Sequence, residues 1–401
     1  MSLKTIFHID MDAFFASCMQ VKYPIYKNKA IVISNNNDKS IITTASYQAR
    51  KYHIKAGMAL FEAKKLYPKI ISVKPDMNYI NNISNQIWTY LKNNVTHKIE
   101  VASIDEAYLD VTDLVLKTDV IKLAKKIQQD ILDEFDISCS IGIGFNKFVA
   151  KMSTSLNKPF GVSLTTIDNF KTNIWNIDIK DMYGVGPSTV KLLENTNIKT
   201  IGDLANTSDQ DIYYLLHNKG LILKKQANGL SSDYVDYLSS EYKSISKETT
   251  LLSAIYQYDE IENIILNLSK QVSDKLIENN LFCKTVEIKL KYKTSSKQYI
   301  TRHKQITLNK YINDSQLIYN NALTCFYDLI DDNKAVILIG VGVSKLISNN
   351  QNWVQLTIDK DQIIDNKQVE QSLLIEDLIF DINKKFNKNI IKKAKDVKKT
   401  R

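Results

Sequence analysis

The spacing of apolar residues near the start of the chain predicts a mixed α+β domain with an insert. The apolar run 6–9 ends in Asp10 and predicts a buried strand. Runs at 30–34 and 41–44 predict a hairpin, and residues 45–67 predict a helix with one interruption. An inserted unit therefore separates the first strand from the rest of its domain.

From position 79 onward the apolar residues recur at helical and strand spacings in turn. Steps of three and four residues predict an amphipathic helix over 79–94, and a second helix is predicted over 120–135. Strands are predicted around the acidic pair Asp105-Glu106 and over 138–143. This order fits a ferredoxin-like α+β sheet, in which Asp10 and the acidic pair reach neighbouring strands.

The pattern changes twice more toward the C-terminus. Residues 167–238 predict short helices around Gly184-Val185-Gly186, with little strand character. Strict alternation over 284–293 predicts a strand with one apolar and one basic face. A second small α+β domain follows from this strand together with a helix and two further strands, at 260–278, 299–308 and 336–343. A last amphipathic helix is predicted over 374–386.

Composition and charge narrow the functional class. Hydrophobic residues make up 44% of the 401 positions, charged residues 24%, and the formal net charge is +9. A basic balance favours a polyanionic partner such as nucleic acid, although solubility alone would also explain it. The four cysteines form no C-x-x-C pair, so we expect neither a zinc site nor a disulfide framework. Because no leader pattern or long apolar run is present, we expect a cytoplasmic protein without membrane contact.

Two acidic clusters carry the candidate chemistry. Nucleotidyl transfer requires that charge be neutralised on the attacking oxygen and on the leaving pyrophosphate, which two Mg²⁺ ions can do. Magnesium prefers oxygen ligands. Asp10 and Asp12 stand two positions apart, so only one of them faces a common site with Asp105-Glu106, and we assign Asp10. Alone, an Asp-x-Asp pattern is more often a loop or a helix cap; the second acidic pair gives it weight.

Several motifs resemble those of one family. The two acidic clusters are similar to the catalytic motifs of Y-family translesion DNA polymerases, most closely the bacterial DNA polymerase IV branch: Asp10-Met11-Asp12-Ala13-Phe14-Phe15 and Ala102-Ser103-Ile104-Asp105-Glu106-Ala107-Tyr108-Leu109-Asp110. The resemblance continues in the fingers motif 44–51 and in the palm motifs Asn146-Lys147, Ala150-Lys151 and Lys158-Pro159. It covers residues 4–345.

The resemblance implies roles for individual residues. Two Mg²⁺ ions would be held by the catalytic carboxylates and one backbone carbonyl, from Asp10, Asp105, Glu106 and Met11. The incoming nucleotide would be bound by residues of the fingers and palm: Phe14, Thr44, Tyr47, Arg50 and Lys158. Phenol, guanidinium and ammonium groups suit phosphate oxygens. Phe15 matches the steric gate that rejects a ribose 2′-hydroxyl, whereas a plain core role is the stronger alternative for Phe14.

DNA and a sliding clamp are the implied macromolecular partners. Glycines 184 and 186 resemble a helix-hairpin-helix, whose backbone N–H groups approach phosphate, although such glycines often only cap a helix. The predicted DNA-binding residues are therefore Gly184, Gly186, Lys289, Lys291, Lys293 and Arg302, with a solvated strand face as the alternative for the strand residues. A clamp-binding peptide is expected at Gln355, Leu356 and Ile358, although Asp359 replaces the usual final aromatic residue.

These inferences give a right-hand polymerase with five parts. We expect a palm at 1–13 and 79–165, fingers at 14–78, a thumb at 166–240, a little finger at 241–347 and a tail at 348–401. The expected activity is low-fidelity lesion bypass by a monomer on primed template DNA, using deoxynucleoside triphosphates and no proofreading. Another two-metal palm enzyme, such as a nucleotide cyclase, and a non-catalytic DNA-binding scaffold are the alternatives.

Overall fold

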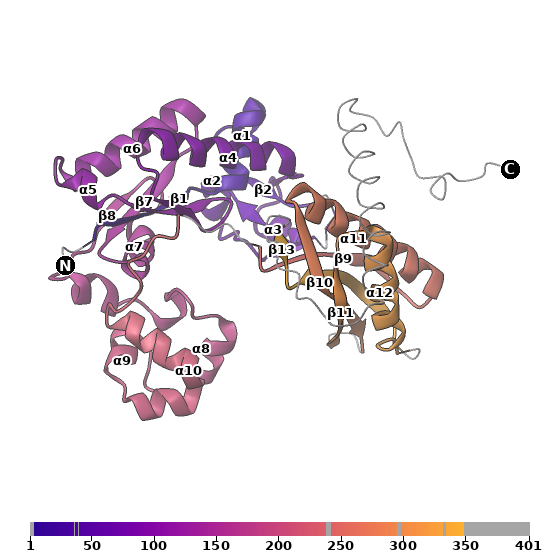
Figure 1. Cartoon of the computed structure of the whole chain (residues 1–401). Coiled ribbons are helices and arrows are strands. Elements are labelled where there is room, and N and C mark those ends of the chain that lie inside the picture. The colour runs from indigo at the N-terminus through magenta and orange to yellow at the C-terminus, as the bar shows by residue number, and fades with distance from the viewer. Residues whose placement is uncertain are drawn as a thin grey trace. The chain divides into compact units, whose positions relative to one another are not determined.

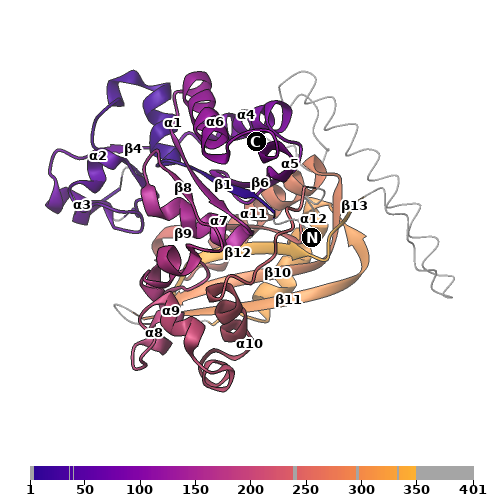
Figure 2. The same ribbon diagram turned by 90° about the vertical axis from the view of Figure 1, so that its left-hand side faces the viewer.

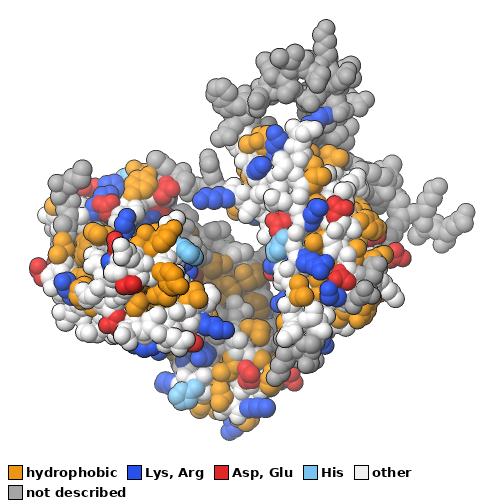
Figure 3. All heavy atoms as spheres, turned by 90° about the horizontal axis from the view of Figure 1, so that it is seen from below, with side chains coloured by type: hydrophobic (Ala, Val, Ile, Leu, Met, Phe, Trp, Pro, Cys, Tyr) orange, Lys and Arg blue, Asp and Glu red, His pale blue; other side chains and the backbone are white. Residues whose placement is uncertain are grey.

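The computed structural model describes residues 4–35, 37–38, 40–237, 242–294, 298–331 and 334–348. The chain divides into two units, Met1–Ser239 and Ser240–Arg401, which run from indigo to pink and from orange to yellow in Figure 1. Within these ranges no helix has the length and apolar content needed to cross a membrane. Basic and acidic side chains are interspersed on the surface that Figure 3 shows.

The first unit is built on a five-stranded sheet. Its strands run in the order β5-β6-β1-β7-β8, with the bounds Ile99–Val101, Glu106–Asp110, Ile6–Met11, Cys139–Gly144 and Val162–Leu164. β1 pairs antiparallel with both β6 and β7, and β8 adds a parallel edge strand. The order of the first four strands is that of the ferredoxin-like fold, so the predicted α+β class is confirmed.

Helices cover both faces of this sheet. α4 (Met77–Asn94) and α6 (Val120–Phe135) lie on one face and α7 (Lys147–Thr154) on the other, as Figures 1 and 2 show. The apolar stripes of α4 and α6 pack against β1, β6 and β7 in one core, and each fully buried Ile or Leu contributes roughly 1.5–3 kcal/mol. The short helices α5 and η2 span Thr112–Val115 and Ser155–Asn157.

A small subdomain separates β1 from α4. Its sheet has the order β3-β2-β4 (Thr44–Ala45, Ile31–Ile33 and Ile71–Val73), surrounded by α1 (Phe14–Lys22), η1 (Pro24–Tyr26), α2 (Tyr47–Arg50) and α3 (Leu60–Leu66). The predicted hairpin is confirmed. The predicted interrupted helix over 45–67 is correct in part: α2 and α3 lie within it and Gly57 lies in the interruption, but that interruption extends over 51–59. There Gly57 and Met58 exchange backbone hydrogen bonds with Ile42, and Gly57 has a φ of +85°, so the chain between the two helices is not helical.

The last part of the first unit is helical, as predicted. It comprises η3 (Lys171–Trp175), η4 (Ile179–Asp181), α8 (Pro187–Leu193), α9 (Ile201–Asn206) and α10 (Asp209–Ala227). A non-helical residue, His217, kinks α10. The core of these helices includes Phe148, Val149 and Met152 of α7, so the helical part packs on the helix that covers the back of the sheet.

The second unit is a four-stranded antiparallel sheet of order β11-β10-β12-β9. The elements are β9 (Ser244–Ile255), α11 (Tyr258–Glu278), β10 (Leu281–Lys293), β11 (Tyr299–Ile312), α12 (Ser315–Tyr327), β12 (Val336–Ser344) and β13 (Ile347–Ser348). α11 and α12 cover one face. β9 was not predicted, because its sequence is largely polar and it forms an edge. The predicted C-terminal helix lies outside the described residues.

Candidate active site

Two of the predicted catalytic carboxylates meet across one strand pair. Asp10 stands directly opposite Glu106 in the antiparallel register of β1 and β6. Directly paired residues of a sheet project to the same face, so the two side chains are neighbours although 96 positions separate them. β1 forms here because its apolar run Ile6–Ile9 is buried on both faces of the sheet.

Asp105 joins this pair from the residue before β6. The Met11 backbone N–H donates to the Asp105 carbonyl at 2.9 Å, which ties the end of β1 to the start of β6. The Ser103 hydroxyl donates to Asp105 Oδ1 at 2.6 Å and thereby orients the carboxylate. Asp10, Met11, Asp105 and Glu106 therefore lie together at one end of the β1–β6 pair.

Lysine ammonium groups neutralise two of the carboxylates. Lys158 Nζ lies 2.5 Å from Asp10 Oδ1, and Lys151 forms an ion pair with Glu106. The Asp10 and Glu106 side chains are only 19% and 21% exposed, so uncompensated charge there would be costly. This end of the sheet is built to hold positive charge.

A buried histidine also borders Glu106. His8 is fully buried in β1; its Nδ1 lies 2.8 Å from Thr154 Oγ1, and its Nε2 lies 3.3 Å from Glu106 Oε2 without hydrogen-bond geometry. Together His8 and Lys151 hold the pKa of Glu106 at about 2, whereas burial lowers the pKa of His8. Glu106 is therefore ionised at neutral pH, as a metal ligand must be.

The donor set suits a hard divalent cation. Three carboxylates and a nearby carbonyl offer only oxygen, the ligand type that Mg²⁺ prefers. Among the residues that the structure describes, no three His, Cys, Asp or Glu side chains already stand at metal-binding spacing. In this structure the ammonium groups of Lys151 and Lys158 supply the positive charge beside Glu106 and Asp10. A bound cation would therefore displace these ammonium groups from the carboxylates.

Asp12 has a different environment from Asp10. Its side chain is buried, with 1% of the residue exposed. It accepts hydrogen bonds from the Ser140 hydroxyl at 2.8 Å, the Phe160 N–H at 2.9 Å and the Tyr47 hydroxyl at 3.4 Å. Asp12 is therefore saturated by protein donors, which agrees with the assignment of Asp10 as the metal-facing acid.

The predicted phosphate-binding residues of the fingers lie on α2 and its approach. Tyr47 and Arg50 share one face of α2, and the guanidinium carbon lies 4.4 Å from the Tyr47 ring centroid. Arg50 Nε donates to the Ala45 carbonyl at 3.0 Å, and Thr44 lies in β3. Burial, with Asp12 nearby, raises the pKa of Tyr47 to about 12, so its hydroxyl remains a hydrogen-bond donor.

The two phenylalanines that open α1 have different surroundings. Phe14 is 2% exposed and lies in the core, whereas Phe15 is half-buried against the same core. Their ring centroids are 6.2 Å apart in an edge-to-face arrangement. Ala13 precedes them with a φ of +45°, which turns the chain sharply between the carboxylates and α1. Only Phe15 presents surface that could meet a sugar.

The predicted DNA-binding residues fall on three different surfaces. Gly184 has a φ of +91°, and a Cβ at Gly186 would meet nothing within 4 Å, so backbone is open at the start of α8. On β10 the face opposite the core carries Lys289, Lys291 and Lys293. Arg302 pairs in register with the fully buried Leu290 and lies 3.5 Å from Asp331, so it projects to the helix-covered side, away from the lysines.

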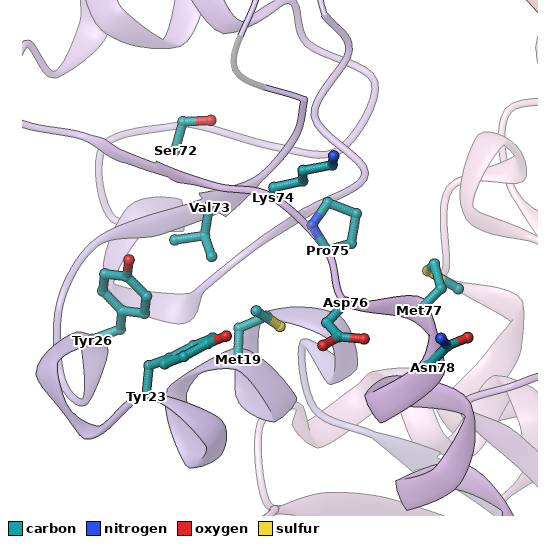
Figure 4. Close-up of a pocket in the computed structure, with 10 residues that line it drawn as sticks. All are labelled: Met19, Tyr23, Tyr26, Ser72, Val73, Lys74, Pro75, Asp76, Met77 and Asn78. Carbon is teal, nitrogen blue, oxygen red and sulfur yellow. The ribbon is translucent and has the colours of Figure 1, made fainter. Parts of the chain in front are cut away.

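The predicted clamp-binding residues Gln355, Leu356 and Ile358 lie outside the described residues. A cavity of about 600 Å³ lies between the end of α1 and the start of α4, with Tyr23 and Tyr26 at one end and Met77 and Asn78 at the other (Figure 4). Neither Asp10 nor the Asp105-Glu106 pair lines this cavity.

Sequence comparison assigns the chain to a family along most of its length. The profile of the impB/mucB/samB family matches residues 9–155, that of its C-terminal domain matches 242–358, and the IMS family HHH motif matches 168–198. The chain belongs to the Y family of DNA polymerases. The polymerase thus carries both acidic motifs inside the first matched segment.

Individual relatives agree with this assignment. DNA polymerase IV of Oceanobacillus iheyensis is 32% identical over 396 residues, 98% of this chain and 92% of the relative. DNA polymerase IV of Clostridium perfringens is 35% identical over 364 residues, 89% and 99% of the two chains. A solved Y-family DNA polymerase chimera superposes with a TM-score of 0.76 at 26% identity, covering 86% of this chain and all of the chimera. The predicted family and its enzyme class, DNA-directed DNA polymerase, are confirmed.

Sequence reasoning gave no role to three residues of the polymerase that surround the acids. Lys151 forms an ion pair with Glu106, and His8 Nε2 lies 3.3 Å from the same carboxylate. Asp12 accepts a hydrogen bond from Tyr47 of α2. One signal was present for Lys151, because Lys147 and Lys151 are four positions apart on α7 and both bind carboxylates of the sheet. The burial of His8 follows from the predicted strand, but its contact with Glu106 and the burial of Asp12 depend on long-range packing that no local pattern reveals.

Proposed function

We propose that the polymerase adds deoxynucleotides to a primer by two-metal nucleotidyl transfer and bypasses template lesions without proofreading. One observation carries the proposal: Asp10 and Glu106 are in direct register with Asp105 beside them. Asp10, Asp105, Glu106 and the Met11 carbonyl would hold two Mg²⁺ ions, which supply charge neutralisation at the α-phosphate and the pyrophosphate.

The protein's own groups bind and orient the nucleotide. Lys158 and Arg50 supply positive charge and Tyr47 a hydroxyl donor for the triphosphate, next to Thr44. Lys158 would exchange Asp10 for phosphate when the nucleotide arrives. The half-buried ring of Phe15 would lie under the sugar and exclude a 2′-hydroxyl, with the buried Phe14 ring supporting it.

The remaining parts would hold primed template DNA. In this proposal, residues 1–13 and 79–165 form the palm, 14–78 the fingers, 166–240 the thumb, 241–347 the little finger and 348–401 a tail with the clamp-binding peptide. The open backbone at Gly184 and Gly186 and the lysine face of β10 suit contacts with the phosphate backbone, which hold DNA without reading its sequence. The cytoplasm and a monomeric state are the proposed setting.

Low fidelity follows from the family and from the size of the fingers. Among the described residues the fingers sheet has three strands, of two to three residues each. The small residues Ala45 and Ser46 are buried within the fingers, so the proposal rests on the small size of this subdomain. A loose site of this kind tolerates distorted template bases. An error frequency as low as that of a replicative polymerase would contradict the lesion-bypass role, and primer shortening that Asp105→Ala abolishes would contradict the absence of proofreading.

Primer extension tests the proposal directly. Wild type, Asp105→Ala and Phe15→Ala are compared on a primed template with Mg²⁺ and deoxynucleotides, and wild type and Phe15→Ala also with ribonucleotides. We expect extension by the wild type, none by Asp105→Ala, and ribonucleotide incorporation by Phe15→Ala only. Release of pyrophosphate from a nucleoside triphosphate in the absence of DNA would favour a nucleotide cyclase, and DNA binding without any extension would favour a scaffold.

A further inference from the structure

A buried carboxylate outside the metal-facing set connects the groups that would bind the nucleotide. Asp12 follows β1 immediately, and its main chain is fixed on both sides: its N–H donates to the Ser138 carbonyl at 2.9 Å, and its carbonyl accepts from the Ser17 hydroxyl at 2.7 Å. The side chain is almost fully enclosed, with 1% of the residue accessible. It therefore has one conformation and a fixed set of partners.

The partners of this carboxylate come from three separate segments. Ser140 belongs to β7 of the palm sheet, Tyr47 to α2 of the fingers, and Phe160 to the loop that follows Lys158. Tyr47 and Lys158 are both proposed ligands of the triphosphate. One side chain thus links two nucleotide-binding segments that are more than 100 positions apart in sequence.

The distances divide the partners into two classes. The bonds from Ser140 and Phe160, at 2.8 and 2.9 Å, are short and hold the carboxylate firmly. The bond from Tyr47, at 3.4 Å, is long and therefore weak. The Tyr47 hydroxyl can exchange its hydrogen bond with Asp12 for one with a phosphate oxygen at little cost in free energy, while the Tyr47 ring stays in place.

We propose that Asp12 is a positioning residue that sets Tyr47 and the Lys158 loop in place for the triphosphate before the nucleotide binds. This inference rests on the proposed function. Asp12 touches neither the reacting atoms nor the ions; it acts through Tyr47 and through the Phe160 N–H. Preorganisation of this kind lowers the ordering cost of binding, so its loss should raise the KM for nucleotide.

The test is a steady-state comparison of Asp12→Asn with a matched control, Asp110→Asn. Asp110 is also a buried acid of the same sheet, 8% exposed, and accepts two hydrogen bonds from Thr112, but at the other end of β6. For Asp12→Asn, whose amide would oppose the Phe160 N–H, we expect the KM for deoxynucleotide to rise about tenfold, with the Kd for DNA unchanged. Asp110→Asn should lower the Tm and leave that KM unchanged.

A double mutant separates positioning from general support. Tyr47→Phe removes the shared hydroxyl, so the KM increase of the double mutant should be smaller than the product of the increases in Asp12→Asn and Tyr47→Phe. If Asp12→Asn is too unstable to assay, Ser140→Ala loosens the same carboxylate and should raise the KM about two- to threefold. An unchanged nucleotide KM in either variant, with wild-type extension intact, overturns this inference alone; absence of wild-type extension overturns the proposed function.

Discussion

The two sheets of the polymerase have the same order of elements along the chain but different strand orders. Leaving out the subdomain between β1 and α4, the short helix α5, and the elements after β7 and after β12, each reads strand, helix, strand, strand, helix, strand. In the first unit the opening strand β1 is central, between β6 and β7; in the second the opening strand β9 is at an edge. A central first strand brings Asp10 directly opposite Glu106, whereas the acids Glu248 and Glu287 of the second sheet stand opposite glycines of β12.

The comparison shows how one arrangement of elements serves two purposes. The palm sheet is covered by helices on both faces, and its chemistry lies at the strand ends. Among the described residues of the second unit, helices cover one face of its sheet, and the other face carries charged side chains along the strands. The first sheet is suited to chemistry at one small site, and the second is suited to binding an extended polyanion.

The largest difference should appear when one glutamate in each sheet loses its charge. Glu106 and Glu287 each lie beside a histidine, His8 and His303. We expect Glu106→Gln to slow nucleotide addition by about a thousandfold, since a metal ligand stabilises charge by several kcal/mol. Glu287→Gln should leave the rate within about twofold. Single-turnover primer extension measures the rate of each variant. Equal effects of the two substitutions would contradict a special role for the acids of the first sheet.

Removing basic residues from the two faces of the second sheet should change DNA affinity unequally. The triple variant Lys289→Ala, Lys291→Ala, Lys293→Ala should reduce the dependence of log affinity on log salt by about 0.9 for each phosphate that is no longer neutralised. Arg302→Ala, on the helix-covered side, should leave this slope unchanged. Fluorescence anisotropy at several salt concentrations provides the measurement, and an equal decrease in slope for Arg302→Ala would place DNA on both faces.

Acid should destabilise the first unit through Glu106. Its pKa is held at about 2, below the value of about 4.3 for a free glutamate. This stabilisation is complete above the unfolded-state pKa and is lost as pH falls from about 5 toward 2, and it amounts to roughly 2–3 kcal/mol. Thermal unfolding between these pH values should therefore show a steeper fall in Tm for wild type than for Glu106→Gln. Parallel curves would contradict the ion pair.

The smallest effect concerns an acid on the open face of the second sheet. Glu248 Oε2 lies 2.7 Å from Lys289 Nζ and would compete with a DNA phosphate for that ammonium group. Exposed ion pairs of this kind contribute about 1 kcal/mol or less. Glu248→Gln should therefore increase DNA affinity about two- to threefold at low salt, whereas Glu278→Gln, which pairs with Lys275 on α11, should not. Weaker binding by Glu248→Gln would argue against a phosphate-facing lysine row.

Much of this architecture could be predicted from sequence because the strong periodicities are local. The helices α4, α6 and α11 and the strand β10 follow directly from apolar spacing, and Asp10 and Asp105-Glu106 from their motifs. The length of the interruption between α2 and α3 could not be predicted, because the pairing of Gly57 with Ile42 is a long-range interaction. β9 was missed because an edge strand needs few apolar residues.

The side of the sheet that Arg302 occupies could have been inferred. Ile306 and Leu308 pack against the core, and counting back in twos from them puts Arg302 on the same side. The roles of His8 and Lys151 required the tertiary structure, since both depend on α7 crossing β1. The clamp-binding peptide remains a prediction from position alone.

The ion pairs of Lys158 with Asp10 and of Lys151 with Glu106 affect the order in which metal ions and nucleotide bind. A tethered cation competes with free ions at the same carboxylate, at a high effective concentration. We therefore expect a weak affinity for divalent ions alone. A triphosphate that draws Lys158 away removes one competitor, so ion and nucleotide should each strengthen the binding of the other to the same degree. Without nucleotide, the occupancy of the metal site would then stay low even when the cellular concentration of Mg²⁺ changes.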